Sequence, residues 1–323
     1  MENIKGILVS ILAPMENHIA NGGEKLLGNA SSIKRRNDGR VYISGQMQRH
    51  VLFSAINRLN NGDPQKGNTY VSNGDGIGNA IEVDLRADMG GFMHPSAGSY
   101  SGRRTAPLTV TPAAATKPSE ITRDLLIRLK VNPATDARDQ ALATKEQSDS
   151  DLMLMNFFFD ISNLSISKKF SYERGFHVRT EYVKHVNEAE RKRRVKLFLE
   201  ATRSMIDYAN EARNASTGEP QKVLIVFDTK MSRKACRYFE NETSEIQRKN
   251  IIDELEERKV FYVIGDDTTG DISVNTAYKK AIEELENSML FDPNEGDENI
   301  QTFAEAFPQA AEVDETPENE TNE

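Results

Sequence analysis

Three apolar segments with strand character, separated by two segments of helical periodicity, limit the folds open to this chain. The apolar segments are 6–14, 152–167 and 221–229, and the helical ones are 45–59 and 187–213. This order, with more strand-like sequence between the two helices, is that of a split βαβ unit. We therefore predict an α+β fold of the ferredoxin-like or RNA-recognition-motif-like type (βαββαβ), in which an antiparallel sheet carries two helices on one face.

The first helical segment has a recognisable start and one apolar face. Ser44 belongs to a residue type that caps helix N-termini, and it stands immediately before the segment. Apolar residues recur at helical spacing on one face: Val51, Leu52, Ala55, Ile56 and Leu59. The second helical segment carries "RKRR" at 191–194. Because four consecutive positions wrap around a helix, we interpret this cluster as a solvated face.

Three polar stretches do not fit the core pattern. Residues 60–85 are rich in glycine and asparagine, and we expect a loop insertion there. Residues 118–151 are highly charged with little apolar periodicity, which indicates a second excursion from the core. Residues 291–323 form an acidic tail that we expect to be disordered, because such a composition cannot bury a core. Residues 1–290 would then contain the folded domain.

The acidic tail accounts for the net charge of the chain. The formal charge is -9, from 41 Lys and Arg against 50 Asp and Glu. Eleven of these carboxylates lie in 289–323, which has no Lys or Arg, so the remainder has 41 basic against 39 acidic residues and a net charge of +2. A nearly neutral body with local basic clusters permits nucleic-acid binding without requiring it.

Composition and motifs argue against an enzyme. The single cysteine, Cys236, cannot form an internal disulfide, and it favours a reducing, cytoplasmic compartment. The apolar run near the N-terminus is too short to span a bilayer, so we expect no membrane partner. No Walker loop, nucleophile elbow or HExxH motif occurs, and the five histidines lack metal-ligand spacing. We predict a non-catalytic binding or scaffolding protein with no metal and no cofactor.

A basic segment that leads into the first helix is the main candidate for ligand binding. Its candidate contacts are Lys34, Arg35, Arg36, Arg40, Ser44, Gln46, Arg49 and His50. A helix N-terminus presents unpaired N–H groups and a favourable dipole to a phosphate, and arginines add forked donors. The serine and glutamine side chains could bond a phosphate or a ribose hydroxyl. A solvated basic turn with an ordinary N-cap explains the same residues equally well.

A second candidate is the stretch that begins with "DMGGFM" at 88–93. Its candidate contacts are Met89, Gly90, Gly91, Phe92, Arg103 and Arg104. The glycines would let a ligand approach the backbone closely, the apolar side chains would pack against a base, and the arginines would meet phosphates. Taken alone, the stretch is better explained as a loose hairpin loop.

Together these segments resemble a known family. "KRRNDGRVYISGQMQRHVLFSAI" resembles the basic loop and first helix of the RAMP proteins of the DevR-type, or "Cas-seven", family, which form the backbone of type I CRISPR Cascade complexes. The family's helix start is matched by Ile43, Ser44, Gln46 and Arg49. "DMGGFM" and "RRTAPLTVTPAAAT" look like the next two family motifs, and "MNFFFDISNLSIS" is similar to the core strand that follows. The resemblance covers residues 4–290.

The resemblance implies a non-catalytic subunit that binds CRISPR RNA (crRNA). Several copies would lie head to tail along one crRNA, hold its sugar-phosphate chain without reading sequence, and leave bases open to pair with target DNA. Residues 118–151 would be the thumb, a β-hairpin that reaches over the neighbouring copy's RNA, and residues 60–85 a reduced finger loop. The other implied partners are the large, small, five-prime-end cap and processing subunits of Cascade.

Two other functions stay open at this level. A related RAMP fold is a metal-independent endoribonuclease that processes CRISPR precursor RNA, and His18 and His50 are candidates for its acid–base residues. A phage or plasmid RNA-binding scaffold unrelated to CRISPR is the third possibility. No paired acid–base arrangement is visible in the sequence, which favours the backbone subunit.

Overall fold

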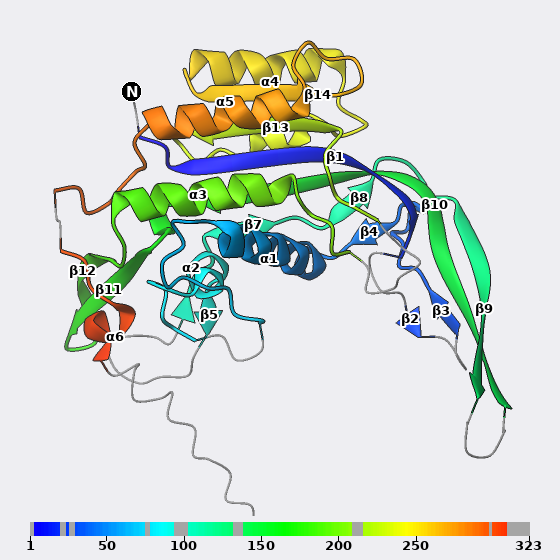
Figure 1. Ribbon diagram of the computed structural model, residues 1–323. Helices are drawn as coiled ribbons and strands as arrows, with labels where there is room; N and C mark the ends of the chain where they lie inside the picture. The colour runs from blue at the N-terminus through cyan, green and yellow to red at the C-terminus, as the bar shows by residue number, and fades with distance from the viewer. Residues whose placement is uncertain are drawn as a thin grey trace, which may run out of the picture.

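The core of the molecule is an antiparallel sheet whose central strand comes first in the chain. The computed structural model describes residues 3–19, 24–25, 30–74, 78–93, 103–131, 138–208, 216–296 and 299–308. Strand β1 (Gly6–His18) lies between β10 (Arg138–Asp160) and β13 (Lys222–Asp228) and is antiparallel to both. Strand β14 (Phe261–Asp266) pairs with β13 at one edge (Figure 1). The predicted mixed α+β class with an antiparallel sheet is confirmed.

Short strands complete the other side of the sheet. Strands β7 (Leu108–Val110) and β8 (Ala113–Ala115) pair antiparallel with β10, and β4 (Tyr42–Ile43) pairs with β8. Strands β2 (Glu24–Lys25) and β3 (Ala30–Ser32) form a small ribbon, in which β3 runs parallel to β10. The order across the centre is therefore β13, β1, β10 and then β7 with β8.

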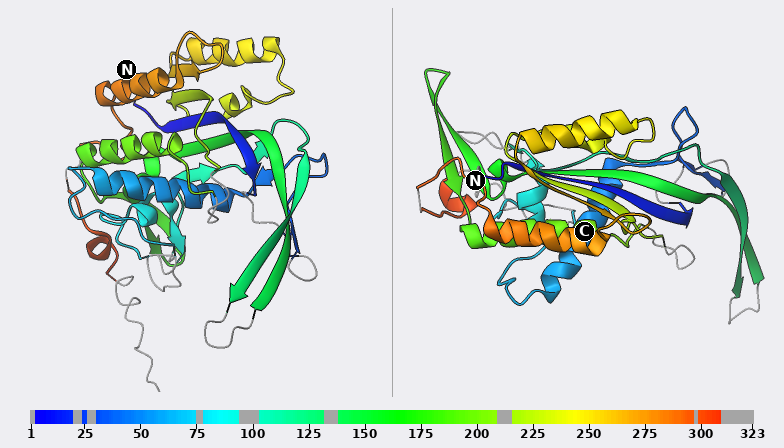
Figure 2. Two further views of the ribbon diagram at one scale, coloured as in Figure 1. Left: turned by 45° about the vertical axis from the view of Figure 1, so that its right-hand side comes forward. Right: turned by 90° about the horizontal axis from the view of Figure 1, so that it is seen from above.

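Helices cover both faces of this sheet, where we predicted helices on one face. Helices α1 (Gly45–Gly62), α3 (Glu188–Thr202) and α5 (Val274–Asn287) bury their apolar residues against one face. Helix α4 (Glu245–Glu257) and the 3-10 helix η2 (Lys234–Arg237) cover the other face (Figure 2). The difference arises because β1, β10 and β13 are apolar on both sides, so neither face can be left in water.

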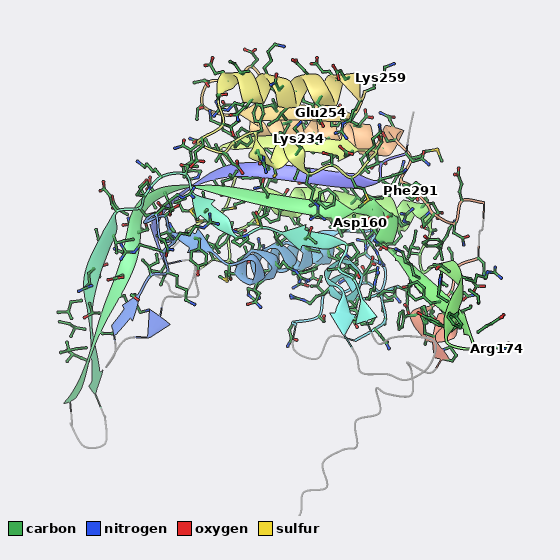
Figure 3. The ribbon with its side chains drawn as sticks, turned by 180° about the vertical axis from the view of Figure 1, so that it is seen from behind. Asp160, Arg174, Lys234, Glu254, Lys259 and Phe291 are labelled. Atoms are coloured by element: carbon green, nitrogen blue, oxygen red, sulfur yellow. The ribbon has the colours of Figure 1, made fainter. Side chains whose placement is uncertain are left out.

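The outer layer is held together by charge as well as by apolar packing. The Lys234 side chain of η2 forms an ion pair with Glu254 of α4, and Figure 3 shows the two side by side. Arg258, at the end of α4, forms a second pair with the buried carboxylate of Asp228. Within the part of the chain that the structure describes, no helix is both long and apolar enough to cross a membrane.

Helix α1 forms as its sequence predicts, whereas α3 is shorter than predicted. Ser44 caps α1, with its hydroxyl oxygen accepting from the backbone N–H of Met47 at 3.2 Å. The predicted apolar face is buried, apart from the half-buried Leu59. Helix α3 ends at Thr202, although the apolar pattern continues through Met205 and Tyr208. Met205 and Tyr208 follow the end of the helix, yet their side chains are buried in the core. The apolar pattern therefore predicted burial correctly but not the length of the helix.

Two hairpins leave the body of the molecule at opposite ends (Figures 1 and 2). Strand β9 (Ile121–Val131) pairs with the first half of β10, so most of residues 118–151 form one hairpin. Strand β11 (Ile166–Glu173) pairs with β12 (Phe176–Lys184) to form the other, and Arg174 lies at its tip (Figure 3). Strand β10 is continuous from the sheet into the first hairpin.

The first part of the predicted acidic tail packs onto the body, which corrects the prediction that all of 291–323 is disordered. Helix α6 (Phe303–Ala306) begins with a capping box formed by Thr302 and Glu305. Phe303, Ala306 and Phe307 are buried and cluster with residues that precede and follow α2 (Leu85–Gly90). The two phenylalanines supply the apolar surface that the acidic composition obscured. Residues 309–323 lie outside the described residues.

Candidate nucleic-acid interface

The predicted basic segment lies on the surface beside the start of α1. Arg35 and Arg36 are exposed, and Lys34 is half-buried. Arg40 is held by Asp38, with 2.7 Å between its Nε and the carboxylate oxygen. Arg36 and Arg40 line a cavity of about 340 Å³, which is completed by β8, β10 and the loop after η2. The segment therefore presents cations in an open, solvent-accessible position.

The residues at the start of α1 divide into exposed and internal groups. Gln46 and His50 are exposed on the first turns. Ser44 uses its hydroxyl oxygen for the cap. Arg49 points inward instead: its Nη2 donates to the carbonyl oxygen of Gly90 at 2.7 Å, and burial lowers the pKa of the guanidinium. Arg49 thus connects the two predicted binding stretches by a hydrogen bond within the protein.

The chain itself occupies the space that the paired glycines were predicted to leave for a ligand. Gly91 has a φ of +66°, and a Cβ there would lie 2.5 Å from the carbonyl oxygen of Arg104. A Cβ on Gly90 would lie 3.0 Å from Nη2 of Arg49. The glycines therefore permit β6 (Arg103–Arg104) and α1 to approach this turn closely. Their presence is explained without any ligand.

Three further predicted contacts are internal in this structure. Met89 has no exposed surface and belongs to the main core. Phe92 packs edge-to-face against Phe303, with ring centroids 5.4 Å apart. Arg104 is 9% exposed, and its Nη2 donates to Asp88 at 2.5 Å and to the carbonyl oxygen of Asn163 at 2.9 Å. Arg103 lies next to it in β6, where it pairs with Met93. Packing thus accounts for Met89 and Phe92.

A cavity of about 190 Å³ lies beside Arg104. Its lining is Arg104, Thr105, Asn163, Ile166, Ser167, Lys168 and Phe170. Two polar atoms of this lining, Nε of Arg104 and Oγ of Ser167, are buried and have no hydrogen-bond partner among the described residues. The lining also brings the cationic side chains of Arg104 and Lys168 together, so the cavity suits a ligand that carries acceptor oxygens. This feature could not be anticipated from sequence, because its residues come from separate strands.

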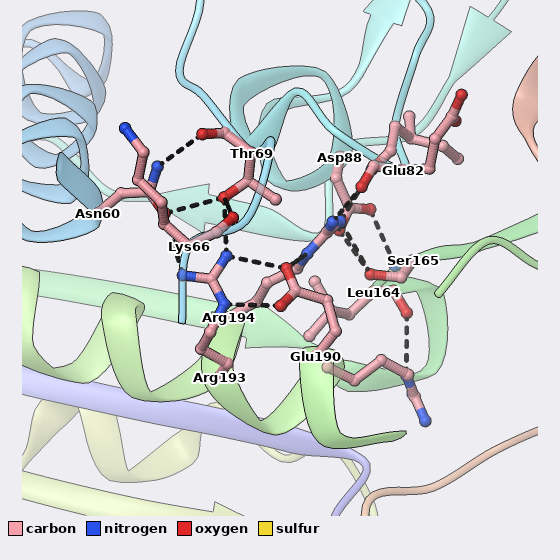
Figure 4. A network of polar contacts seen from close by, with 12 residues as sticks. Asn60, Lys66, Thr69, Glu82, Asp88, Leu164, Ser165, Glu190, Arg193 and Arg194 are labelled. Carbon is pink, nitrogen blue, oxygen red and sulfur yellow. Dashed lines mark hydrogen bonds and ion pairs between the residues drawn. The ribbon is translucent and has the colours of Figure 1, made fainter. Parts of the chain in front are cut away.

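The "RKRR" cluster, predicted as a solvated face, is mostly buried (Figure 4). Arg194 has no exposed surface: its Nε donates to Glu190 at 2.8 Å, and its Nη1 donates to Asp88 at 2.7 Å. Arg193 is 8% exposed and bonds Asp63 at 2.8 Å and Glu190 at 2.6 Å. The prediction was wrong because acidic partners on α3 and on segments that pack against it neutralise the arginines.

The network has further acceptors in backbone carbonyls and in the side chains of Asn60, Thr69, Ser165 and Glu188. Arg191, which is 2% exposed, donates to the carbonyl oxygens of Leu164, Ile161 and Phe291. Burial raises the pKa of Asp88, but Arg194 and Arg104 outweigh that effect and hold it below its usual value. The cluster therefore fixes α3 to the surrounding loops and is not available to a ligand.

The two histidines considered for catalysis have different environments. His18 has no exposed surface, and its Nε2 lies 2.8 Å from Asp151. The same carboxylate accepts from the hydroxyls of Ser119 and Ser148, each at 2.6 Å. His18 is therefore enclosed at the base of the β9–β10 hairpin, away from solvent. His50 is exposed on α1 and takes no part in this group.

Comparisons with known proteins give one family match and a likeness of fold. A family model described as "CRISPR-associated negative auto-regulator DevR/Csa2" matches residues 27–231. No curated protein matches the chain significantly. A solved chain titled "CRISPR RNA-guided surveillance complex" is 13% identical, with a TM-score of 0.49 over 86% of this chain and 99% of that chain. Another, titled "CRISPR RNA-guided surveillance complex, pre-nicking", is 10% identical, with a TM-score of 0.50 over 87% and 99%, which shows a shared fold.

Proposed function

Because the chain belongs to the DevR/Csa2 family of CRISPR-associated proteins, we propose that it is a non-catalytic backbone subunit of a type I Cascade complex. Copies assemble head to tail along the spacer part of a crRNA and present it for pairing with target DNA. The RNA-recognition-motif-like palm consists of β1, α1, β7 with β8, β10, α3 and β13, in that order along the chain. The large, small, cap and processing subunits complete the complex in the cytoplasm.

The exposed part of the basic segment is the proposed grip on the RNA backbone. Arg35, Arg36, Gln46 and His50 lie on the surface beside the N-terminus of α1. Cations and a helix N-terminus attract phosphates whatever the base sequence, which suits a subunit that must bind any spacer. In the second stretch we retain Arg104 as a phosphate contact, through the cavity that its guanidinium lines. Met89 and Phe92 are left out because they are internal.

The observation that carries the proposal of head-to-tail assembly is the apolar face of the β9–β10 hairpin. Leu125, Ile127 and Leu129 are 62%, 52% and 66% exposed and alternate along β9, so they share one face. Leu142 lies opposite Ile127 on β10 and is 49% exposed. A two-stranded hairpin with an uncovered apolar face needs a partner surface. The hairpin therefore serves as the thumb, which packs on the neighbouring copy and its RNA.

Assembly on RNAs of increasing length tests this function. We expect the number of bound copies, measured by mass photometry, to rise in proportion to RNA length, with regular filaments in electron micrographs. Serine at Leu125, Ile127 and Leu129 should retain binding of a single copy but abolish regular filaments. The matched control is Ile246→Ser, which removes an equally exposed side chain (74%) from α4.

Each outcome of that experiment separates the alternatives. Regular filaments formed by the triple variant would contradict the assignment of the hairpin as the thumb. A fixed copy number on every RNA length would contradict the backbone function itself. Loss of filaments in the Ile246→Ser control would show that any loss of exposed apolar surface has the same effect. The triple variant would then give no support to the assignment of the hairpin as the thumb.

A further inference from the structure

The first part of the acidic region is fixed against the second predicted RNA-binding stretch, and residues 309–323, called the tail from here on, follow it. The Phe303 ring packs on Phe92 and on Phe307, with centroid distances of 5.4 and 4.8 Å. Phe92 is in turn the strand partner of Arg104. The backbone is held as well, because His185 Nδ1 bonds the carbonyl oxygen of Gln301 at 2.8 Å. The tail therefore begins beside the wall of the Arg104 cavity.

The Arg104 cavity has the chemistry of an anion site. Arg104 and Lys168 both line it, so it brings two cationic side chains together. Asp88 is shared between Arg104 and Arg194, and Arg194 also pairs with Glu190. The pKa of His185 is lowered to about 4, first by burial and then by the charge of Arg104, as expected in a positive field.

The tail has matching charge and sufficient length. Residues 309–323 contain six carboxylates and no Lys or Arg. Fifteen residues can span up to about 50 Å when extended, so the tail can reach any part of the neighbouring cationic surface. Tethering beside that surface gives the tail an effective concentration in the millimolar range. An acidic segment at that concentration competes with nucleic acid for the same cations.

From these observations we propose that residues 309–323 act as an internal competitor for RNA phosphates. In the subunit without RNA, tail carboxylates dock at the cavity lined by Arg104, Ser167 and Lys168. A long RNA that contacts many cations displaces the tail, whereas a short or incidental RNA does not. The inference rests on the proposed RNA-binding function, and it adds that the tail sets a threshold for which RNAs are bound.

Three proteins and one short RNA test the competition. The first protein is the full chain, the second ends after Pro308, and the third keeps the tail length but carries Gln or Asn in place of its six carboxylates. Affinity for a fluorescein-labelled oligouridylate is measured by anisotropy from about 50 to 200 mM salt. Both variants should bind several-fold more tightly than the full chain at the lowest salt, and the advantage should shrink as salt rises. A control in which alanine replaces Thr316, Asn319 and Asn322 keeps every charge and should bind like the full chain.

The proposed docking site of the tail is tested by repeating the truncation in a protein that also carries Lys168→Gln. The gain in affinity from removing the tail should be smaller there, because one of the cations that the tail occupies is gone. An unchanged gain would overturn the docking site. Equal binding by the full chain, the truncation and the neutral tail would overturn the competition while leaving the proposed function intact. A gain from truncation without a gain from neutralisation would overturn the electrostatic cause, and no RNA binding by any protein would overturn the function itself.

Discussion

Two basic clusters in this chain look alike in sequence and differ completely in the fold. "KRRNDGR" at 34–40 places Arg35 and Arg36 in solvent beside the start of α1. "RKRR" at 191–194 places three of its four cations inside the protein, and Arg194 has no exposed surface. We predicted the first cluster as a ligand site and the second as a solvated surface. Only the exposure of the first agrees with the structure.

The difference lies in the acceptors that surround each cluster. Glu190 stands one helical turn before Arg193 and Arg194. Helix α2 supplies Asp88, and the segment before it supplies backbone carbonyls. In the exposed cluster Asp38 is the acid that holds Arg40. A buried guanidinium is tolerated where every donor meets an acceptor. The number of nearby acceptors, rather than the density of arginines, therefore distinguishes a structural cluster from a binding one.

Breaking the buried cluster should have the largest effect. Arg194→Ala leaves Asp88 and Glu190 without a main partner, and loss of one member of a buried pair costs about 3–5 kcal/mol of folding free energy. Urea denaturation followed by circular dichroism measures the loss. Lys196→Ala, an exposed position on the same helix, should change the free energy by less than about 0.5 kcal/mol.

Arg194→Lys sharpens this prediction if the alanine variant does not fold. Lysine retains the charge but cannot reproduce the five hydrogen bonds that Nε, Nη1 and Nη2 make to Glu190, Asp88, Ser165 and the carbonyls of Ile81 and Glu82. It should therefore lose part of the stability. Full stability of either variant would mean that the network contributes little and that the two clusters differ less than their burial indicates.

A smaller loss is expected where the exposed cluster meets the helix. Ser44→Ala removes the oxygen that accepts from the Met47 N–H and should cost about 1 kcal/mol of folding free energy. Ser44→Thr keeps an oxygen in place and should stay close to the parent in urea denaturation. If alanine were as stable as serine, the cap would not contribute to the position of the α1 N-terminus.

The smallest effect on stability is expected in the exposed cluster, together with a large effect on RNA binding. Alanine at Lys34, Arg35, Arg36 and Arg40 should change the folding free energy by less than about 0.5 kcal/mol per site. The slope of log affinity against log salt should fall by about 0.7 for each lost phosphate contact on single-stranded RNA, whatever its sequence. Unchanged affinity would show that the cluster is only a solvated turn.

Alanine at Lys279 and Lys280, two exposed positions on α5, provides the matched control for RNA binding. These residues carry the same charge but lie outside the proposed RNA path. The loss of affinity per removed charge should therefore be clearly smaller than in the basic segment. An equal loss would indicate a general effect of net charge rather than a specific grip on the RNA backbone.

Local patterns predicted the parts of the fold that depend on neighbouring residues. The cap and apolar face of α1 and the central strands β1, β10 and β13 follow from periodicity and turn residues. The burial of the arginines in "RKRR" could not be predicted from local patterns, because Arg194 and its partner Asp88 are 106 residues apart. The roles of Gly90 and Gly91 also depend on distant segments. The start of α6 could have been predicted from the capping-box residues Thr302 and Glu305 and the two phenylalanines. The overall acidity of the segment led us to predict disorder instead.

The Asp151 group at the base of the β9–β10 hairpin has a mechanical consequence. From Asp151 to Arg138 the strand extends about 43 Å at a rise of about 3.3 Å per residue, so a rotation of only 5° at the base displaces the tip by about 4 Å. His18, Ser119 and Ser148 all bond to that one carboxylate. A small change of angle at the base is amplified along the continuous strand β10. The three hydrogen bonds to Asp151 therefore fix the position of the hairpin tip as well as that of its base.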